Sequence, residues 1–160
     1  MLIRRDKMKI KEIIAYEILD SRGWPTVECV LTLDDGRFVS SSVPSGASVG
    51  EHEAVELRDG DRSRFSGKGV LRAIENIEKI IAPAVIGKKP NVTKIDKVLI
   101  ALDGTLNKSR LGANAILAVS IAVVRAQALC EATRLYDLIS RLIGQKKSFP
   151  KIMFNILNGG

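Results

Sequence analysis

The chain has 160 residues, about the length of one domain, and 46% of them are hydrophobic, which is enough to build a core. Only 4% are aromatic, so aliphatic side chains and alanine must fill that core, and little surface remains for stacking nucleic-acid bases. The formal net charge is +7, but beyond residue 11 the basic side chains are scattered. The composition therefore argues against nucleic acid as a partner and favours a phosphorylated metabolite.

The cysteines and the apolar runs indicate a cytoplasmic protein. Cys29 and Cys130 both lie inside apolar patterns, which predicts buried free thiols and fits a reducing compartment. No secretory signal is visible, because no long apolar run follows the basic N-terminus. The most apolar stretch, residues 116–124, is far shorter than the roughly 20 residues of a membrane-spanning helix. We therefore expect no membrane span.

After a basic tail at residues 1–7, the chain shows the alternation of β-strands. In the first strand one parity predicts the buried face, and it comprises Met8, Ile10, Ile14, Tyr16 and Ile18. In the second strand the side chains predicted to be buried are Val27, Cys29, Leu31 and Leu33. A third strand runs from Arg37 to Val43. Short polar turns separate the three strands, which predicts an antiparallel meander.

Helical periodicity follows the strands. A helix that begins after Gly69 is predicted to end at Pro83, because proline lacks an N–H group. A second helix begins at Asn91 or Thr93, and either side chain can cap it. The third, residues 113–128, is apolar nearly all round and is therefore predicted to be the central helix. A fourth helix is expected to end at Gly144.

The order of strands and then helices predicts an α+β fold, in which a helical bundle packs against a three-stranded antiparallel meander. Residues 8–144 form this predicted domain. Residues 145–150 indicate a linker, and residues 152–157 indicate a short strand that has no partner in this plan. We therefore predict that residues 145–160 are the linker and first strand of a second domain.

The stretch from Val43 to Gly50, with the sequence VPSGASVG, is the candidate functional loop. Small side chains leave its backbone groups accessible, which suits an anionic or metal-bound ligand. On composition alone, an ordinary turn is the simpler explanation of Ser48. The nearby His52 is better explained as a solvated residue than as a catalytic one. A charge-paired, solvated segment is likewise preferred to a metal site for the acidic residues Glu51, Glu53, Glu56, Asp59 and Asp61.

Several motifs, in this order along the chain, resemble the enolase family. They are DSRG at 20–23, PTVE at 25–28, VPSGAS at 43–48, LRDGD at 57–61, LDGT at 102–105, LGANAIL at 111–117 and NILNGG at 155–160. A single motif of this kind is weak, but together they cover nearly the whole chain from Ile10 onward. The chain is therefore similar to the N-terminal capping domain of an enolase, followed by the first strand of its barrel.

The resemblance implies a function. Enolases are lyases of glycolysis that reversibly dehydrate 2-phosphoglycerate to phosphoenolpyruvate, using Mg²⁺ and a lysine base. The resemblance places Gly46 and Ala47 beside the substrate. It makes Ser48 a ligand of the second magnesium ion, in a loop that closes over the site. It also implies a homo-oligomer that pairs through this domain, with Arg22 at the interface.

Three departures from the family pattern qualify this expectation. Val49 stands where the family usually has threonine, and Trp24 stands where it usually has asparagine. The family's catalytic base, acids and metal carboxylates lie in a barrel of about 250 residues that would follow Gly160. We therefore expect no catalytic residue in this chain and no activity from it alone. The alternative is a non-catalytic, enolase-derived binding or dimerisation module.

Overall fold

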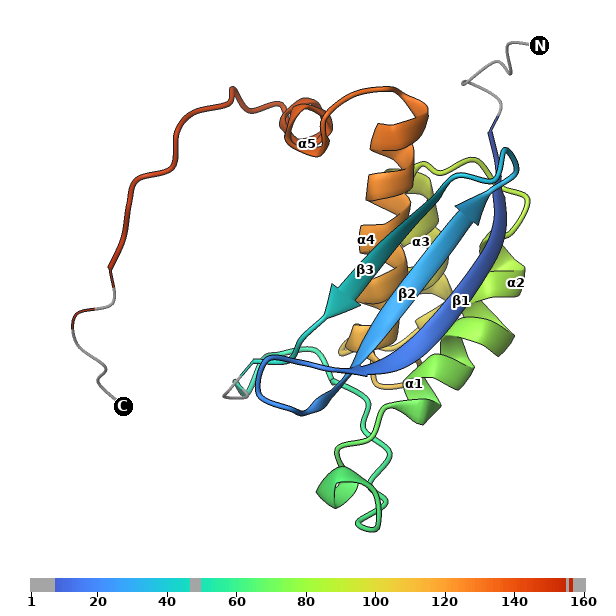
Figure 1. Ribbon diagram of the computed structural model, residues 1–160, viewed down its shortest axis with the longest axis vertical. Helices are drawn as coiled ribbons and strands as arrows, with labels where there is room; N and C mark the ends of the chain where they lie inside the picture. The colour runs from blue at the N-terminus through green and yellow to red at the C-terminus, as the bar shows by residue number, and fades with distance from the viewer. Residues whose placement is uncertain (1–7, 47–49, 155, 157–160) are drawn as a thin grey trace.

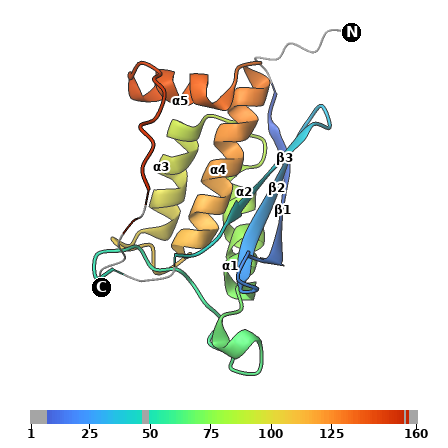
Figure 2. The same cartoon turned by 60° about the vertical axis from the view of Figure 1, so that its left-hand side comes forward.

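The computed structural model describes residues 8–46, 50–154 and 156. Its first part is an antiparallel sheet of three strands in the order β1–β2–β3. The strands are β1 (Ile10–Leu19), β2 (Pro25–Leu33) and β3 (Phe38–Val43). The helices lie on one face of this sheet (Figure 1; Figure 2). The predicted α+β fold with an antiparallel meander is thus confirmed.

Four helical segments longer than a single turn follow the sheet in the described residues. The first is continuous and consists of α1 (Leu71–Asn76), the π-helical segment η3 (Ile77–Ile81) and α2 (Ala82–Val85). The others are α3 (Val92–Asp103), α4 (Ala113–Cys130) and α5 (Leu135–Ile143). A short 3₁₀ turn, η2 (Phe65–Gly67), precedes them. Asn91 caps α3 by accepting a hydrogen bond from the Lys94 amide at 3.0 Å, so Thr93 is not the cap.

The core lies between the sheet and α4. The predicted inward side chains of β2 are fully buried, and ten residues of α4 are buried as well. By length and composition α4 could cross a membrane, but 61% of it is buried inside the fold, as expected for the central helix of a core. Each large aliphatic side chain removed from water contributes about 1.5–3 kcal/mol. Cys29 belongs to this core, and burial raises the pKa of its thiol to about 12, whereas Cys130 is only half-buried.

The predicted parity of β1 is wrong beyond Ile10. A β-bulge lies between Ile10 and Glu12, where the pairing with β2 shifts by one residue. Because one extra residue exchanges the two faces of a strand, Ile13 is buried and the Tyr16 side chain is 48% exposed. Ile14 and Ile18 share the outer face with Tyr16, and both are half-buried. The sequence carries no turn residue at the bulge, so alternation alone could not reveal it.

The prediction that Pro83 ends the first helix is also wrong, since the helix continues to Val85. The preceding turn is π-helical, and the N–H of Ala82 donates to the carbonyl of Ile77, five residues back. This wider turn accommodates a proline ring, which would clash with the carbonyl four residues back in a regular helix. Gly87, with φ of +79°, follows the true end.

The end of the described chain differs from the prediction of a strand at 152–157. Residues 151–154 and 156 belong to no strand or helix. A strand requires a hydrogen-bonded neighbour, and the described part of the chain offers none there. Figure 1 shows this segment running away from the helices. Its large apolar side chains are consequently exposed, as is the preceding Phe149: Ile152, Met153, Phe154 and Ile156.

Both edges of the sheet carry additional contacts. On β1, the Ile10 amide donates to the carbonyl of Lys88 at 2.9 Å, and the Gly87 amide donates to the Ile10 carbonyl at 2.8 Å. On β3, the Arg125 guanidinium donates to the carbonyl of Ser40 at 2.6 Å. Backbone groups at a sheet edge otherwise offer a template for another strand. These contacts occupy part of that template.

Asp103 organises the connection between α3 and α4. It is 1% exposed, and its carboxylate accepts hydrogen bonds from the amides of Thr105 (2.9 Å) and Leu111 (2.8 Å) and from the Thr105 hydroxyl. Burial acts to raise the pKa of Asp103, but these hydrogen bonds outweigh it and lower the pKa below 3.8. The charged form is therefore the one that the fold stabilises.

We predict that Asp103→Asn lowers the free energy of unfolding near neutral pH by about 1–3 kcal/mol, because an amide NH₂ group replaces one acceptor oxygen. The folded pKa is depressed, so the carboxylate stabilises the fold above the ordinary value of 3.8 and loses this contribution as pH falls. The difference between the two proteins should thus shrink at about pH 3 in urea denaturation. Asp34→Asn, at an exposed position, is the control and should have little effect at either pH.

Candidate functional site

One end of the candidate loop is fixed by the turn that joins β1 to β2. Arg22 in this turn donates from Nη2 to the carbonyl oxygen of Ser45 at 2.6 Å. The same guanidinium contacts Asp20 Oδ2 through Nε at 3.3 Å and Nη2 at 3.1 Å. One step earlier, the Thr26 hydroxyl donates to the carbonyl of Val43. The chain is therefore held at two successive points as it leaves β3.

Asp20 is itself immobilised. Its side chain is 3% exposed, and Oδ1 accepts hydrogen bonds from the amides of Arg22 (2.8 Å) and Trp24 (2.9 Å). The hydrogen bond from Trp24 is the largest cause that lowers the pKa of Asp20, and the contacts with Arg22 act in the same direction against the effect of burial. Asp20 is thus a charged carboxylate that orients the Arg22 guanidinium.

The chain that follows the candidate loop is fixed at the start of α4, through Val55 and Leu57. Val55 donates to the carbonyl of Asn107 at 2.7 Å and accepts from the Ala113 amide at 2.8 Å. The Asn114 side chain accepts from the Leu57 amide at 3.1 Å and donates to the Leu57 carbonyl at 3.0 Å. Asn114 thereby satisfies both backbone groups of one residue, as a neighbouring strand would. The chain returning from the loop is aligned with the core helix.

Between these two ends, the described loop residues are accessible. Gly46 and residues 50–54 are exposed, and Ser45 is half-buried. Ala47, Ser48 and Val49 lie outside the described residues, so the placement of the expected magnesium ligand is not described. The structure brings Arg22 against the loop through Ser45, a contact that the sequence did not predict.

The acidic segment after the loop is largely charge-paired or used in caps. Glu56 pairs with Arg58 at 2.6 Å. Asp59 accepts from the amides of Leu71 (3.0 Å) and Arg72 (2.9 Å) at the start of α1. His52 is exposed, and no group of His, Cys, Asp or Glu in the described residues is arranged to hold a metal ion. The preference for a solvated, charge-paired segment holds for Glu56, whereas the Asp59 side chain is only 10% exposed.

A further set of contacts connects the turn after β1 with residue 68. It involves Trp24, one of the departures from the family pattern. The ammonium group of Lys68 lies 3.5 Å from the centre of the indole ring. Arg58 donates to the carbonyls of Pro25 (2.7 Å) and Lys68 (2.6 Å), which ties the same segments together. A cation–π contact of this kind is worth about 0.5–2 kcal/mol. Trp24 and Lys68 are far apart in the sequence, and no spacing signal could have paired them.

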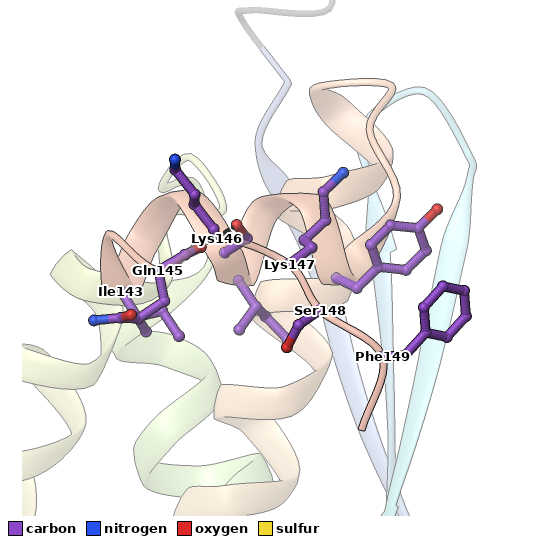
Figure 3. Close-up of a pocket in the computed structure, with 9 residues that line it drawn as sticks. Ile143, Gln145, Lys146, Lys147, Ser148 and Phe149 are labelled. Atoms are coloured by element: carbon purple, nitrogen blue, oxygen red, sulfur yellow. Dashed lines mark hydrogen bonds between the residues drawn. The ribbon is translucent and has the colours of Figure 1, made fainter. Parts of the chain in front are cut away.

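A separate apolar surface lies on α5. Figure 3 shows a cleft between this helix and residues 145–149, lined by Tyr136, Ile139, Ile143 and Phe149 among others. Leu138 is the one residue of α5 that is fully buried, whereas Ile139 is 41% exposed and Ile143 is 61% exposed. Lys147 pairs with Asp137, and its ammonium group lies 5.4 Å from the Tyr136 ring. The helix therefore presents apolar area that the described residues leave open to solvent.

The fold and the site define a class of protein: an α+β domain that presents a glycine- and serine-rich loop fixed at both ends. In the described residues it gathers no group of His, Cys, Asp or Glu side chains that could hold a metal ion. A family model described as "Enolase, N-terminal domain" matches residues 10–139. The chain therefore belongs to the enolase N-terminal domain family.

Two curated relatives show how much of an enolase this chain spans. It is 53% identical over 159 residues to "Enolase" of Malacoplasma penetrans (strain HF-2), and 52% identical over 155 residues to "Enolase 1" of Entamoeba histolytica (strain ATCC 30459 / HM-1:IMSS / ABRM). Each match covers 96% of this chain and 35% of the relative. The chain thus spans about a third of the length of these curated relatives.

The attachment of the loop at α4 depends on the lack of a side chain at Gly112. Its φ is +94°, and a Cβ atom there would lie 2.6 Å from both Leu57 Cβ and Asn114 Oδ1. Gly36 has a similar φ of +85°, but nothing lies within 4 Å of its hypothetical Cβ. Alanine substitutions at the two glycines therefore distinguish the cost of backbone strain, which both share, from the cost of a steric clash, which only Gly112 has.

We predict that Gly112→Ala destabilises the fold by more than the roughly 1–3 kcal/mol expected for a strained backbone alone, because Leu57 and Asn114 must also move. Gly36→Ala is the matched control and should show the backbone cost only. Urea denaturation measures both losses, and amide hydrogen exchange at Val55 and Leu57 should accelerate in the Gly112 variant alone. Equal losses for the two variants would contradict the close packing at Gly112.

Proposed function

We propose that this chain supplies the loop-bearing N-terminal domain of an enolase, which interconverts 2-phosphoglycerate and phosphoenolpyruvate in the cytoplasm. The observation that carries the proposal is the position of the VPSGAS motif. In a domain of this family, Arg22 fixes Ser45 within the motif, and Asn114 fixes Leu57 in the chain that follows it. A loop held in this way can meet a ligand without disturbing the core.

The loop residues have distinct roles in this proposal. Gly46 and Ala47 lie next to the substrate, where the absence of large side chains lets the backbone approach it. Ser48 contributes its hydroxyl and carbonyl oxygens to the second magnesium ion, and such hard oxygen donors suit Mg²⁺. When bound, the metal stabilises the negative charge that develops on the substrate carboxylate.

This chain alone does not complete a magnesium site. One serine offers two oxygen donors, whereas octahedral Mg²⁺ takes about six ligands. The described residues gather no further cluster of candidate ligands, and the curated relatives are almost three times as long as the matched region. We therefore assign the other ligands and the lysine base to a following barrel domain, with residues 145–160 as the linker and its first strand.

The exposed apolar side chains of α5 and of residues 149–154 and 156 support this assignment to two domains. Soluble domains rarely leave contiguous apolar area open unless another surface covers it. In the proposal the barrel covers this area. The domain also takes part in a homo-oligomer, with Arg22 at the interface.

The proposal is tested in a chimera, in which this chain replaces the aligned N-terminal third of the Malacoplasma penetrans enolase. We predict Mg²⁺-dependent formation of phosphoenolpyruvate, measured by absorbance. Ser48→Ala should lower kcat/KM and raise the Mg²⁺ requirement by at least about tenfold, because a metal ligand is lost. Ser109→Ala, at an exposed position on the α3–α4 connection, is the matched control and should leave both unchanged.

Two results would contradict the proposal. Turnover by residues 1–160 alone would show that the chain holds a complete catalytic site. A folded but inactive chimera would favour the non-catalytic binding or dimerisation module. Circular dichroism and thermal melting establish that each chimera is folded.

A further inference from the structure

We propose that Arg22 is a positioning residue, which fixes the Ser45–Gly46 peptide where the chain leaves the sheet. The link from this peptide to catalysis rests on the proposed function, but the restraint itself does not. Arg22 Nη2 lies 2.6 Å from the Ser45 carbonyl oxygen and 3.4 Å from the Ser45 hydroxyl, across 23 residues of sequence. A guanidinium bound to a carbonyl on another segment is a crosslink between the two segments.

The crosslink is stronger than an ordinary surface ion pair. Exposed ion pairs contribute little, because two long side chains lose their freedom to form one contact. Here the Asp20 carboxylate is already held by two backbone amides, so only the arginine side chain has to be ordered. Gly23 has φ of +76°, which lets the turn curl tightly enough to present both amides. The guanidinium is thereby oriented before it reaches Ser45.

The position of Ser45 explains why such a restraint is needed there. Strand β3 ends at Val43, and Pro44 has no N–H group with which to extend the ladder. Beyond Ser45 comes Gly46, whose backbone adopts many conformations. The Ser45 carbonyl is the last described group before this glycine that receives a bond from another segment. Arg22 therefore sets the direction in which the chain enters the loop.

Lysine cannot reproduce this geometry. The planar guanidinium contacts Asp20 with Nε and Nη2 and turns Nη2 toward Ser45, whereas an ammonium group is a single point of charge on a flexible stem. Arg22→Lys should keep the charge and lose most of the directional restraint. Arg22→Ala should lose both. The matched control is Arg62→Ala, since Arg62 is an exposed arginine in a nearby loop.

The first measurement is ¹⁵N relaxation on the 160-residue chain. We expect the order parameters of Ser45 and Gly46 to fall from about 0.85 toward 0.6 in Arg22→Ala, to fall by an intermediate amount in Arg22→Lys, and to stay unchanged in Arg62→Ala. The thermal midpoint should change little, because the core is untouched. Unchanged order at Ser45 and Gly46 in Arg22→Ala would overturn the proposal.

The second measurement uses the active chimera. Arg22→Ala should lower kcat at least about tenfold with a smaller change in KM, since a misdirected loop impairs the reaction more than ground-state binding. Arg22→Lys should recover part of this loss. If the order parameters fall and kcat is unchanged, Arg22 restrains the peptide without serving the reaction, and the catalytic part of the inference is wrong.

The outcomes separate this inference from the proposed function. An inactive wild-type chimera would refute the function while leaving the relaxation result intact. Sedimentation velocity of the same variants tests the interface assignment of Arg22. A change in oligomeric state with unchanged order parameters would assign Arg22 to the interface instead.

Discussion

The packing of α4 against the inner face of β2 and β3 is the constraint on which the rest of the domain depends. It buries an almost wholly apolar helix on a strand whose inward side chains have no exposed surface. Two hydrogen bonds fix how α4 is oriented on the sheet: the Ser41 hydroxyl donates to the Ala118 carbonyl, and Arg125 donates to the Ser40 carbonyl. Once α4 is placed, its first turn fixes residues 55–57, and the sheet fixes the turn that holds Ser45. The packing of the hydrophobic core therefore determines where the chain enters and leaves the candidate loop.

The arrangement separates stability from function within one domain. The buried residues form a continuous interior, whereas the described residues between Val43 and Val55 carry small or exposed side chains. Hydrogen bonds from Arg22, Thr26 and Asn114 hold the chain on either side of the loop against the sheet and α4. Enzymes often place binding residues on such loops, because a rigid scaffold defines the ends and the intervening residues are free to suit the ligand. This is the physical basis for assigning the loop to substrate and metal in the proposed enolase.

The sequence predicted those parts of the fold that depend on local periodicity. Strand β2, helix α4 and the glycine that ends α5 each follow from a pattern within a few residues. The bulge in β1 and the π-helical turn before Pro83 could not be predicted, because both depend on how one element fits against another. The strand expected at 152–157 is not formed by the described residues there, since they have no hydrogen-bonded neighbour. At the site, the sequence indicated the loop motif, and it indicated Arg22 only as an interface residue. The Arg22–Ser45 and Trp24–Lys68 contacts could not be predicted, because each joins distant segments. The role of Ser48 stays a proposal.

The contacts at the sheet edges bear on how copies of this chain can associate. Lys88 and Gly87 occupy the backbone of Ile10 in β1, and Arg125 occupies the carbonyl of Ser40 in β3. A neighbouring strand that paired along either edge at these positions would have to displace these groups. Addition of another strand along Ile10 or Ser40 is accordingly disfavoured in the folded domain.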